Sequence, residues 1–159
     1  MLVKSLICVV IPAHNEGNVI YNTVNDLFTK QNYPHDLFDV YVICHNCTDN
    51  TKQEALRAGA KVIEENNDDP KTHIVSYALK TGYSEILKTG IDYDFVIRLD
   101  ADNHINDEFF NLMNDAFNNI SRMLKKDAYM FLYFHDSSLT VWNDLIKIFD
   151  KNDLIFQTS

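Results

Sequence analysis

The feature that most constrains the fold is a nearly continuous apolar run at Ser5–Ile11 (SLICVVI). A strand with one face in water alternates apolar and polar residues. A run that is apolar at almost every position is typical of a central parallel strand buried on both faces. Pro12 ends the run, because proline has no N–H to donate to a neighbouring strand. The sequence therefore predicts a sheet that is covered on both faces.

Strand-like and helix-like segments alternate along the rest of the chain. Runs rich in β-branched and aromatic residues predict further strands at Asp39–Cys44, Ala60–Glu64, Asp94–Leu99 and Ala128–Phe134. Apolar residues at helical spacing fall between them, at about Gly17–Lys30, around Leu56, around Tyr77, at Phe109–Ile120 and around Trp142. This alternation predicts an α/β fold with a Rossmann-like, mostly parallel sheet and helices on both faces. We expect residues 1–159 to form a single domain.

The composition narrows the range of partners and compartments. The 159 residues carry a formal net charge of −9. This charge argues against nucleic acid as a partner, because nucleic acid selects basic surfaces. No apolar run reaches the ~18 residues that a membrane-spanning helix needs. Three cysteines without the pattern of a disulfide framework indicate a reducing compartment, so we expect a cytoplasmic protein.

Polar residues follow three of the expected strands at the point where each strand ends. They occupy Pro12–Glu16, His45–Asp49 and Asp100–Asp102. The carboxyl ends of parallel strands share one edge of the sheet, and ligands bind at that edge in open α/β sheets. An extended chain would point the carboxylates of Asp100 and Asp102 the same way. Such a pair suits a hard divalent cation, which usually brings a phosphate with it.

These three motifs resemble those of the family 2 glycosyltransferases, which bind a nucleotide-sugar on a Rossmann-like sheet of the GT-A type. The matching residues are VVIPAHNE at 9–16, NCTDNT at 46–51 and LDADN at 99–103. The resemblance extends from about Ser5 to about Phe117. It implies a UDP-linked sugar donor, an Mn²⁺ or Mg²⁺ ion, and inverting transfer of the sugar to a saccharide or lipid-linked acceptor.

The resemblance also implies roles for individual residues in the first two motifs. Pro12, Ala13 and Glu16 correspond to the loop that meets the uridine ribose and base. His45 stands where the family usually has an acid that reads the uracil edge. A neutral histidine offers one donor and one acceptor, so base recognition is expected to differ here. Asp49 corresponds to the family's acid at the start of the second helix.

The acids that follow the fourth strand correspond to the family's D-x-D pair. The resemblance implies that Asp102 contacts Mn²⁺ or Mg²⁺ directly, and that Asp100 acts through the ribose or a metal-bound water. Family members often carry a lysine just ahead of the segment that corresponds to Tyr77–Leu79. No lysine precedes it directly here, which leaves no lysine near the phosphates unless Lys71 reaches them.

The end of the chain departs from the family pattern. Family members continue into an acceptor-binding half that holds the catalytic base, and after Phe117 only Asp136 is a candidate, a poor match. We therefore expect the acceptor half to be largely absent and to be supplied by a missing C-terminal segment or by self-association. A missing segment or partner would also bring the chain to the inner face of the membrane. The alternative is a non-catalytic nucleotide-binding or interaction domain derived by truncation of such an enzyme.

Other interpretations use some of the same residues. A nucleotidyltransferase would share the sheet and the acids, but Pro12–Gly17 lacks its glycine-rich basic loop. The segment Cys44–Cys47 has the spacing of a thioredoxin-like redox motif, and it also offers part of a zinc site. His104 follows the D-x-D pair closely and is a further candidate metal ligand. His73 has no context in the sequence and is assigned no role.

Overall fold

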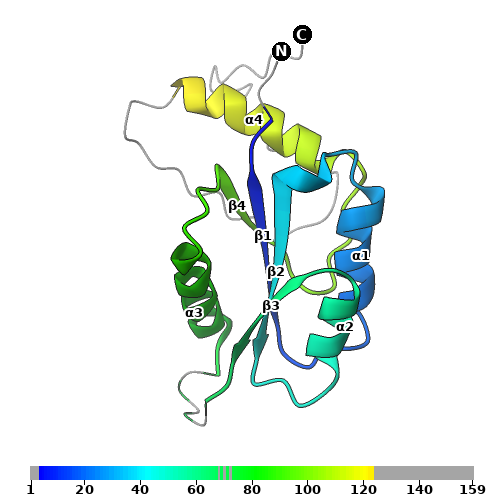
Figure 1. The fold of residues 1–159 in the computed structure, drawn as a ribbon, viewed down its shortest axis with the longest axis vertical. Helices are drawn as coiled ribbons and strands as arrows, with labels where there is room; N and C mark the ends of the chain where they lie inside the picture. Colours follow the sequence, from blue (N-terminus) through cyan, green and yellow to red (C-terminus); the bar gives the residue numbers. More distant parts are fainter. Residues whose placement is uncertain (1–3, 68, 70, 72, 124–159) are drawn as a thin grey trace, which may run out of the picture.

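The computed structural model describes residues 4–67, 69, 71 and 73–123. Four parallel strands form one sheet in the order β3-β2-β1-β4. They are β1 (Ile7–Ala13), β2 (Phe38–His45), β3 (Lys61–Glu65) and β4 (Phe95–Arg98). This arrangement confirms the predicted α/β fold and its parallel sheet (Figure 1). The strand expected at Ala128–Phe134 and the helix expected around Trp142 lie outside the described residues.

Helices cover both faces of the sheet, as the sequence predicts (Figure 1). On one face, buried side chains of α1 (Ile20–Lys30), α2 (Thr51–Arg57) and α4 (Phe109–Met123) pack against the strands. On the other face, α3 (Val75–Lys88) packs through Ala78 and Ile86. A short 3₁₀ turn, η1 (His35–Leu37), leads into β2. Within the described part of the chain, no helix is both long and apolar enough to cross a bilayer.

The strand β1 shows why its sequence is apolar at almost every position. Ile7, Val9 and Ile11 point into the core under α1 and α2, and Cys8 and Val10 point into the core under α3. All five side chains are fully buried. A central strand between two helical layers has no solvent-facing side, so the usual alternation disappears.

The strand β4 is only partly covered, although the sequence predicts a sheet that is covered on both faces. Ile97 is buried, but Val96 is 51% exposed. The reason is position, because β4 lies at one edge of the four described strands and α3 packs against β1, β2 and β3. The strand face that carries Val96 also carries Arg98, since side chains alternate along a strand. This uncovered side of β4 borders the site described below.

Candidate functional site

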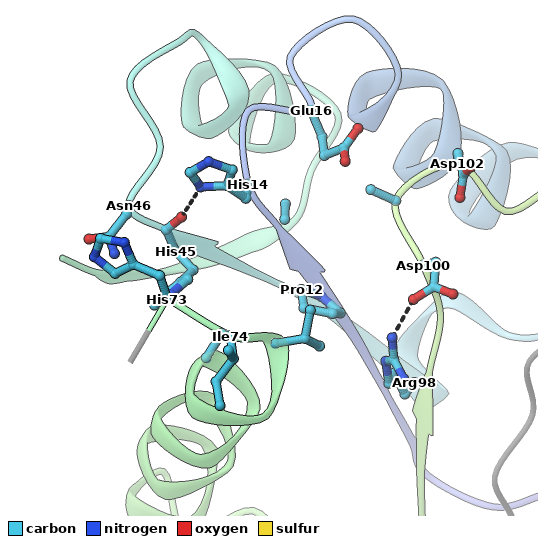
Figure 2. A pocket seen from close by; sticks show the side chains of 14 residues that line it. Pro12, His14, Glu16, His45, Asn46, His73, Ile74, Arg98, Asp100 and Asp102 are labelled. Atoms are coloured by element: carbon cyan, nitrogen blue, oxygen red, sulfur yellow. Dashed lines mark hydrogen bonds and ion pairs between the residues drawn. The ribbon is translucent and has the colours of Figure 1, made fainter. Parts of the chain in front are cut away.

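A cavity of about 410 Å³ opens where β1, β2 and β4 end (Figure 2). Its lining also includes the segment that leads into α3 and the first turn of α3. The lining residues are Pro12, Ala13, His14, Glu16, His45, Asn46, His73, Ile74, Val75, Ala78, Arg98, Asp100, Ala101 and Asp102. The three polar motifs therefore meet at one cavity. Of the seven predicted site residues, all but Asp49 line it.

One end of the cavity is acidic (Figure 2). The chain leaves β4 after Arg98 and turns, and the Asn103 N–H donates to the Asp100 carbonyl at 3.1 Å. The D-x-D segment is therefore not extended, and both carboxylates nevertheless reach the cavity lining. The Arg98 guanidinium forms an ion pair with Asp100 Oδ1 at 2.5 Å. Asp102 is exposed and forms no ion pair with any described residue.

These side chains suit a cation that arrives with a phosphate rather than one held by protein alone. Among the described residues, no group of three His, Cys, Asp or Glu side chains could hold a metal ion. Mg²⁺ and similar ions are often bound by one or two carboxylates, with substrate phosphates and waters completing the shell. Asp100 and Asp102 supply such carboxylates. The cavity lining carries three carboxylates, since Glu16 adds to Asp100 and Asp102, and one guanidinium, that of Arg98. This excess of negative charge would repel a diphosphate unless a further cation were present.

The other end of the cavity carries three histidines and Asn46 (Figure 2). The His14 Nδ1–H donates to the His45 carbonyl at 2.8 Å. The His45 ring contacts Glu65 through Nδ1, and its Nε2 is buried without a partner in the described part of the chain. The His73 ring lies edge-on to the His45 ring, with centroids 6.0 Å apart. This end therefore presents flat rings with polar edges, which suits an aromatic ligand group.

Asp49 serves the site from outside the cavity. Its carboxylate accepts hydrogen bonds from the Gly17 N–H at 3.0 Å and from the N–H and hydroxyl of Thr51. The Thr51 hydroxyl in turn accepts the Glu16 N–H at 2.8 Å. Burial acts to raise the pKa of Asp49, but the hydrogen bonds from Thr51 and Gly17 outweigh it and lower the pKa. Asp49 and Thr51 thus hold the loop that carries Glu16.

Two asparagines shape the loops around the cavity. Asn15 and Asn46 have positive φ angles of 57° and 49°, a left-handed conformation that asparagine tolerates better than most residues. Asn15 Oδ1 accepts the Thr48 N–H at 2.7 Å, and Asn46 Oδ1 accepts the Asn67 N–H at 2.8 Å. The loop after β2 is therefore bonded both to the loop after β1 and to the loop after β3.

The structure argues against the redox and zinc interpretations of Cys44–Cys47. Burial, reinforced by Cys47, raises the pKa of the Cys44 thiol to about 12, which suppresses the thiolate that redox chemistry needs. The Cys47 thiol donates to the Ala13 carbonyl at 3.4 Å. The helix α2 begins only at Thr51, so neither cysteine lies in its first turn. His104 is exposed and is absent from the cavity lining.

Four cavity residues were given no role from the sequence: His14 and Asn46, which lie within the predicted polar motifs, and His73 and Arg98, which lie outside them. Arg98 could have been found, because an arginine inside an apolar strand, two residues before Asp100, lies on the same side of the chain. His73 carries no local signal, since only the tertiary fold brings its loop to the end of β2. Lys71, the one lysine considered as a partner for the phosphates, is exposed and does not line the cavity.

Comparisons with known proteins agree with this architecture. The sequence model of glycosyl transferase family 2 matches residues 8–124. The mannosyltransferase PcManGT from Pyrobaculum calidifontis, solved with GDP-Man and Mn²⁺, is 20% identical with a TM-score of 0.56, over 70% of this chain and 32% of that chain. The M. tuberculosis glucosyl-3-phosphoglycerate synthase is 23% identical with a TM-score of 0.51, over 67% of this chain and 38% of that chain. This chain therefore spans only about a third of the length of these proteins. No curated protein matches it.

Proposed function

The chain belongs to glycosyl transferase family 2, and on that premise we propose that its cavity binds the nucleotide of a nucleoside-diphosphate sugar together with a divalent cation. One observation carries the proposal. Three separate strand ends deliver their polar residues to a single cavity, which is acidic at one end and lined by histidine rings at the other. A nucleoside diphosphate is flat and aromatic at one end and anionic at the other, so the two patterns correspond.

The charges of the lining support one orientation of the ligand over the other. The base lies toward His45 and His73, and the diphosphate lies toward Asp100 and Asp102. Asp102 and Asp100 would hold Mn²⁺ or Mg²⁺ against the phosphates. When bound, the cation supplies electrostatic stabilisation of the leaving diphosphate. Arg98 keeps the Asp100 carboxylate in place through its ion pair.

Pro12, Ala13 and Glu16 complete the proposed donor site between these two ends. Ala13 is buried at the end of β1, and its small side chain lets the backbone approach a ribose. Glu16 is held by the Thr51 hydroxyl through its N–H, which leaves its carboxylate available to a ligand hydroxyl group. We extend the proposal to a UDP-linked or GDP-linked sugar, to inverting transfer, and to a saccharide or lipid-linked acceptor. Guanine is included as a second candidate base because the structural neighbour PcManGT was solved with GDP-Man.

Titration calorimetry with UDP and GDP, each with Mn²⁺ and with EDTA, tests the proposal. We expect Mn²⁺ to tighten binding by on the order of tenfold or more, which corresponds to about 1.4 kcal/mol. The Asp102→Asn variant should lose this dependence on the metal ion. Asp107→Asn is a matched control, because Asp107 is also an exposed acid but does not line the cavity. Equal affinities with Mn²⁺ and with EDTA in the unaltered chain would contradict the metal-bridged site.

A further inference from the structure

We propose that Glu65, which lies outside the cavity, selects the base of the nucleotide by fixing which nitrogen of the His45 ring carries the proton. This inference rests on the proposed function, because it concerns the base-binding end of the same site. Glu65 is here a positioning residue that acts through His45 and has no contact with the ligand. The class of ligand that it selects is a nucleotide whose base carries a ring N–H at its base-pairing edge, as uracil and guanine do.

The geometry that supports the proposal lies at the ends of β2 and β3. His45 is the last residue of β2, Glu65 is the last residue of β3, and the two are register partners in the sheet. Both side chains are only 9% exposed, and His45 Nδ1 contacts Glu65 Oε2 directly. The other carboxylate oxygen of Glu65, Oε1, accepts a hydrogen bond from the Asn67 side-chain amide. Both oxygens of Glu65 are therefore engaged, and its carboxylate has a fixed orientation.

The backbone around His45 is fixed as well. The Asn46 N–H donates to the Glu65 carbonyl at 2.9 Å, and the His14 ring donates to the His45 carbonyl at 2.8 Å. The rings of His73 and Tyr77 pack beside the His45 ring, with centroid distances of 6.0 and 6.4 Å. The imidazole is thus held by its partners on one edge and by two rings along its sides.

These contacts determine the tautomer of the neutral ring. An ionised carboxylate can only accept hydrogen bonds, so the His45 nitrogen that faces Glu65 carries the proton. Nδ1 is then the donor, and Nε2 is an acceptor. Nε2 is buried, and it has no protein partner in the described part of the chain although His45 lines the cavity. An unsatisfied buried acceptor at a cavity favours a ligand that offers it a hydrogen.

The bases differ at the position that would meet this acceptor. Uracil presents N3–H and guanine presents N1–H, and either can donate to His45 Nε2. Cytosine and adenine present a bare ring nitrogen at the corresponding position, which would set one lone pair against another. Sites built around a specific hydrogen bond reject analogues that leave the buried group unpaired. Where the family usually has a carboxylate acceptor, this chain therefore offers the neutral Nε2 of His45. Glu65 on the neighbouring strand fixes the tautomer in which Nε2 is the acceptor.

The first test compares base preference in the unaltered chain, in Glu65→Gln and in Glu64→Gln. Glu64 is the matched control, because its side chain is 47% exposed and pairs with Lys52 on the surface. UDP, GDP, CDP and ADP are titrated with Mn²⁺ at about pH 8, where free imidazole is neutral. We expect the unaltered chain and Glu64→Gln to prefer UDP or GDP over CDP and ADP by about tenfold or more. In Glu65→Gln this preference should fall to about threefold or less, because glutamine can donate to Nδ1 and so permit the other tautomer.

The second test reads the tautomer itself by ¹⁵N NMR of the His45 ring, without any nucleotide. We expect a single Nδ1–H tautomer in the unaltered chain and a substantial Nε2–H population in Glu65→Gln. If Glu65→Gln does not fold, the tautomer and the base preference of the unaltered chain decide the question. An Nε2–H tautomer, an absent base preference, or a preference that survives in folded Glu65→Gln overturns this inference and leaves the proposed function standing. Failure of all four nucleotides to bind overturns both.

Discussion

The most informative perturbation away from the cavity is Thr51→Val. Thr51 is fully buried, and its hydroxyl bridges two loops by donating to Asp49 and accepting the Glu16 N–H at 2.8 Å. Valine has nearly the same shape but no hydroxyl. The substitution therefore removes the bridge without opening a cavity, and it leaves a part-buried N–H without its partner.

The expected cost follows from these two hydrogen bonds. Leaving a buried polar group unsatisfied costs about 1–3 kcal/mol, so we expect the free energy of unfolding to fall by about 2 kcal/mol in Thr51→Val. Thr51→Ser is the matched control, because it keeps the hydroxyl and loses one buried methyl group. That loss is expected to cost about 1 kcal/mol. The loop that carries Glu16 should loosen in the valine variant only.

Urea denaturation followed by far-ultraviolet circular dichroism measures the stabilities, and UDP titration with Mn²⁺ measures the effect on the cavity. We expect stability in the order parent, Thr51→Ser, Thr51→Val, with weaker nucleotide binding only in the valine variant. If Thr51→Val is as stable as Thr51→Ser or more stable, the hydroxyl bridge does not hold the loop, and the assignment of Asp49 to that bridge is wrong.

Three further predictions concern other parts of the molecule. Gly82→Ala should destabilise the fold by about 1–3 kcal/mol in urea denaturation, because its Cβ would lie 2.0 Å from Ile43 Cδ1; an unchanged midpoint would contradict this close packing. Asp49 has a lowered pKa in the folded state, so its stabilising contribution is present above its ordinary value of 3.8 and is lost as the pH falls through the folded value. The free energy of unfolding should therefore fall less at low pH in Asp49→Asn than in the parent. An equal fall in both proteins would refute this prediction. Asp102→Ala should keep the thermal midpoint within about 1 °C, because Asp102 is an exposed loop residue; a large drop would make it structural.

The sequence was sufficient to predict the four described strands and the edge of the sheet at which the cavity opens. The side chains of β1 are buried on both faces of the sheet, and the unbroken apolar run of this segment is enough to predict that burial. The convergence of Pro12, His45 and Asp100 on one cavity follows from parallel topology, because strands that run the same way end at the same edge. The burial of β1 is predicted from the pattern of apolar residues, and the shared edge is predicted from the alternation of strands and helices. Both patterns can be read directly along the sequence.

What the sequence could not supply are contacts between loops that are remote along the chain. Gly17 and Asp49 are 32 residues apart, and nothing in either motif shows that the Asp49 carboxylate faces the other loop rather than the cavity. The same holds for His45 and Glu65, which only the register of β2 and β3 brings together. The exposure of Val96 depends on β4 lying at an edge of the described sheet beyond the reach of α3, which is a property of the whole sheet.

The most direct test of the account is a crystal structure of this chain with UDP and Mn²⁺, with diffraction data collected for the anomalous signal of manganese. We predict one anomalous peak beside Asp102, the diphosphate next to that peak, and the uracil ring against His45. A nucleotide bound outside this cavity, or a manganese ion held away from both Asp100 and Asp102, would contradict the proposed donor site.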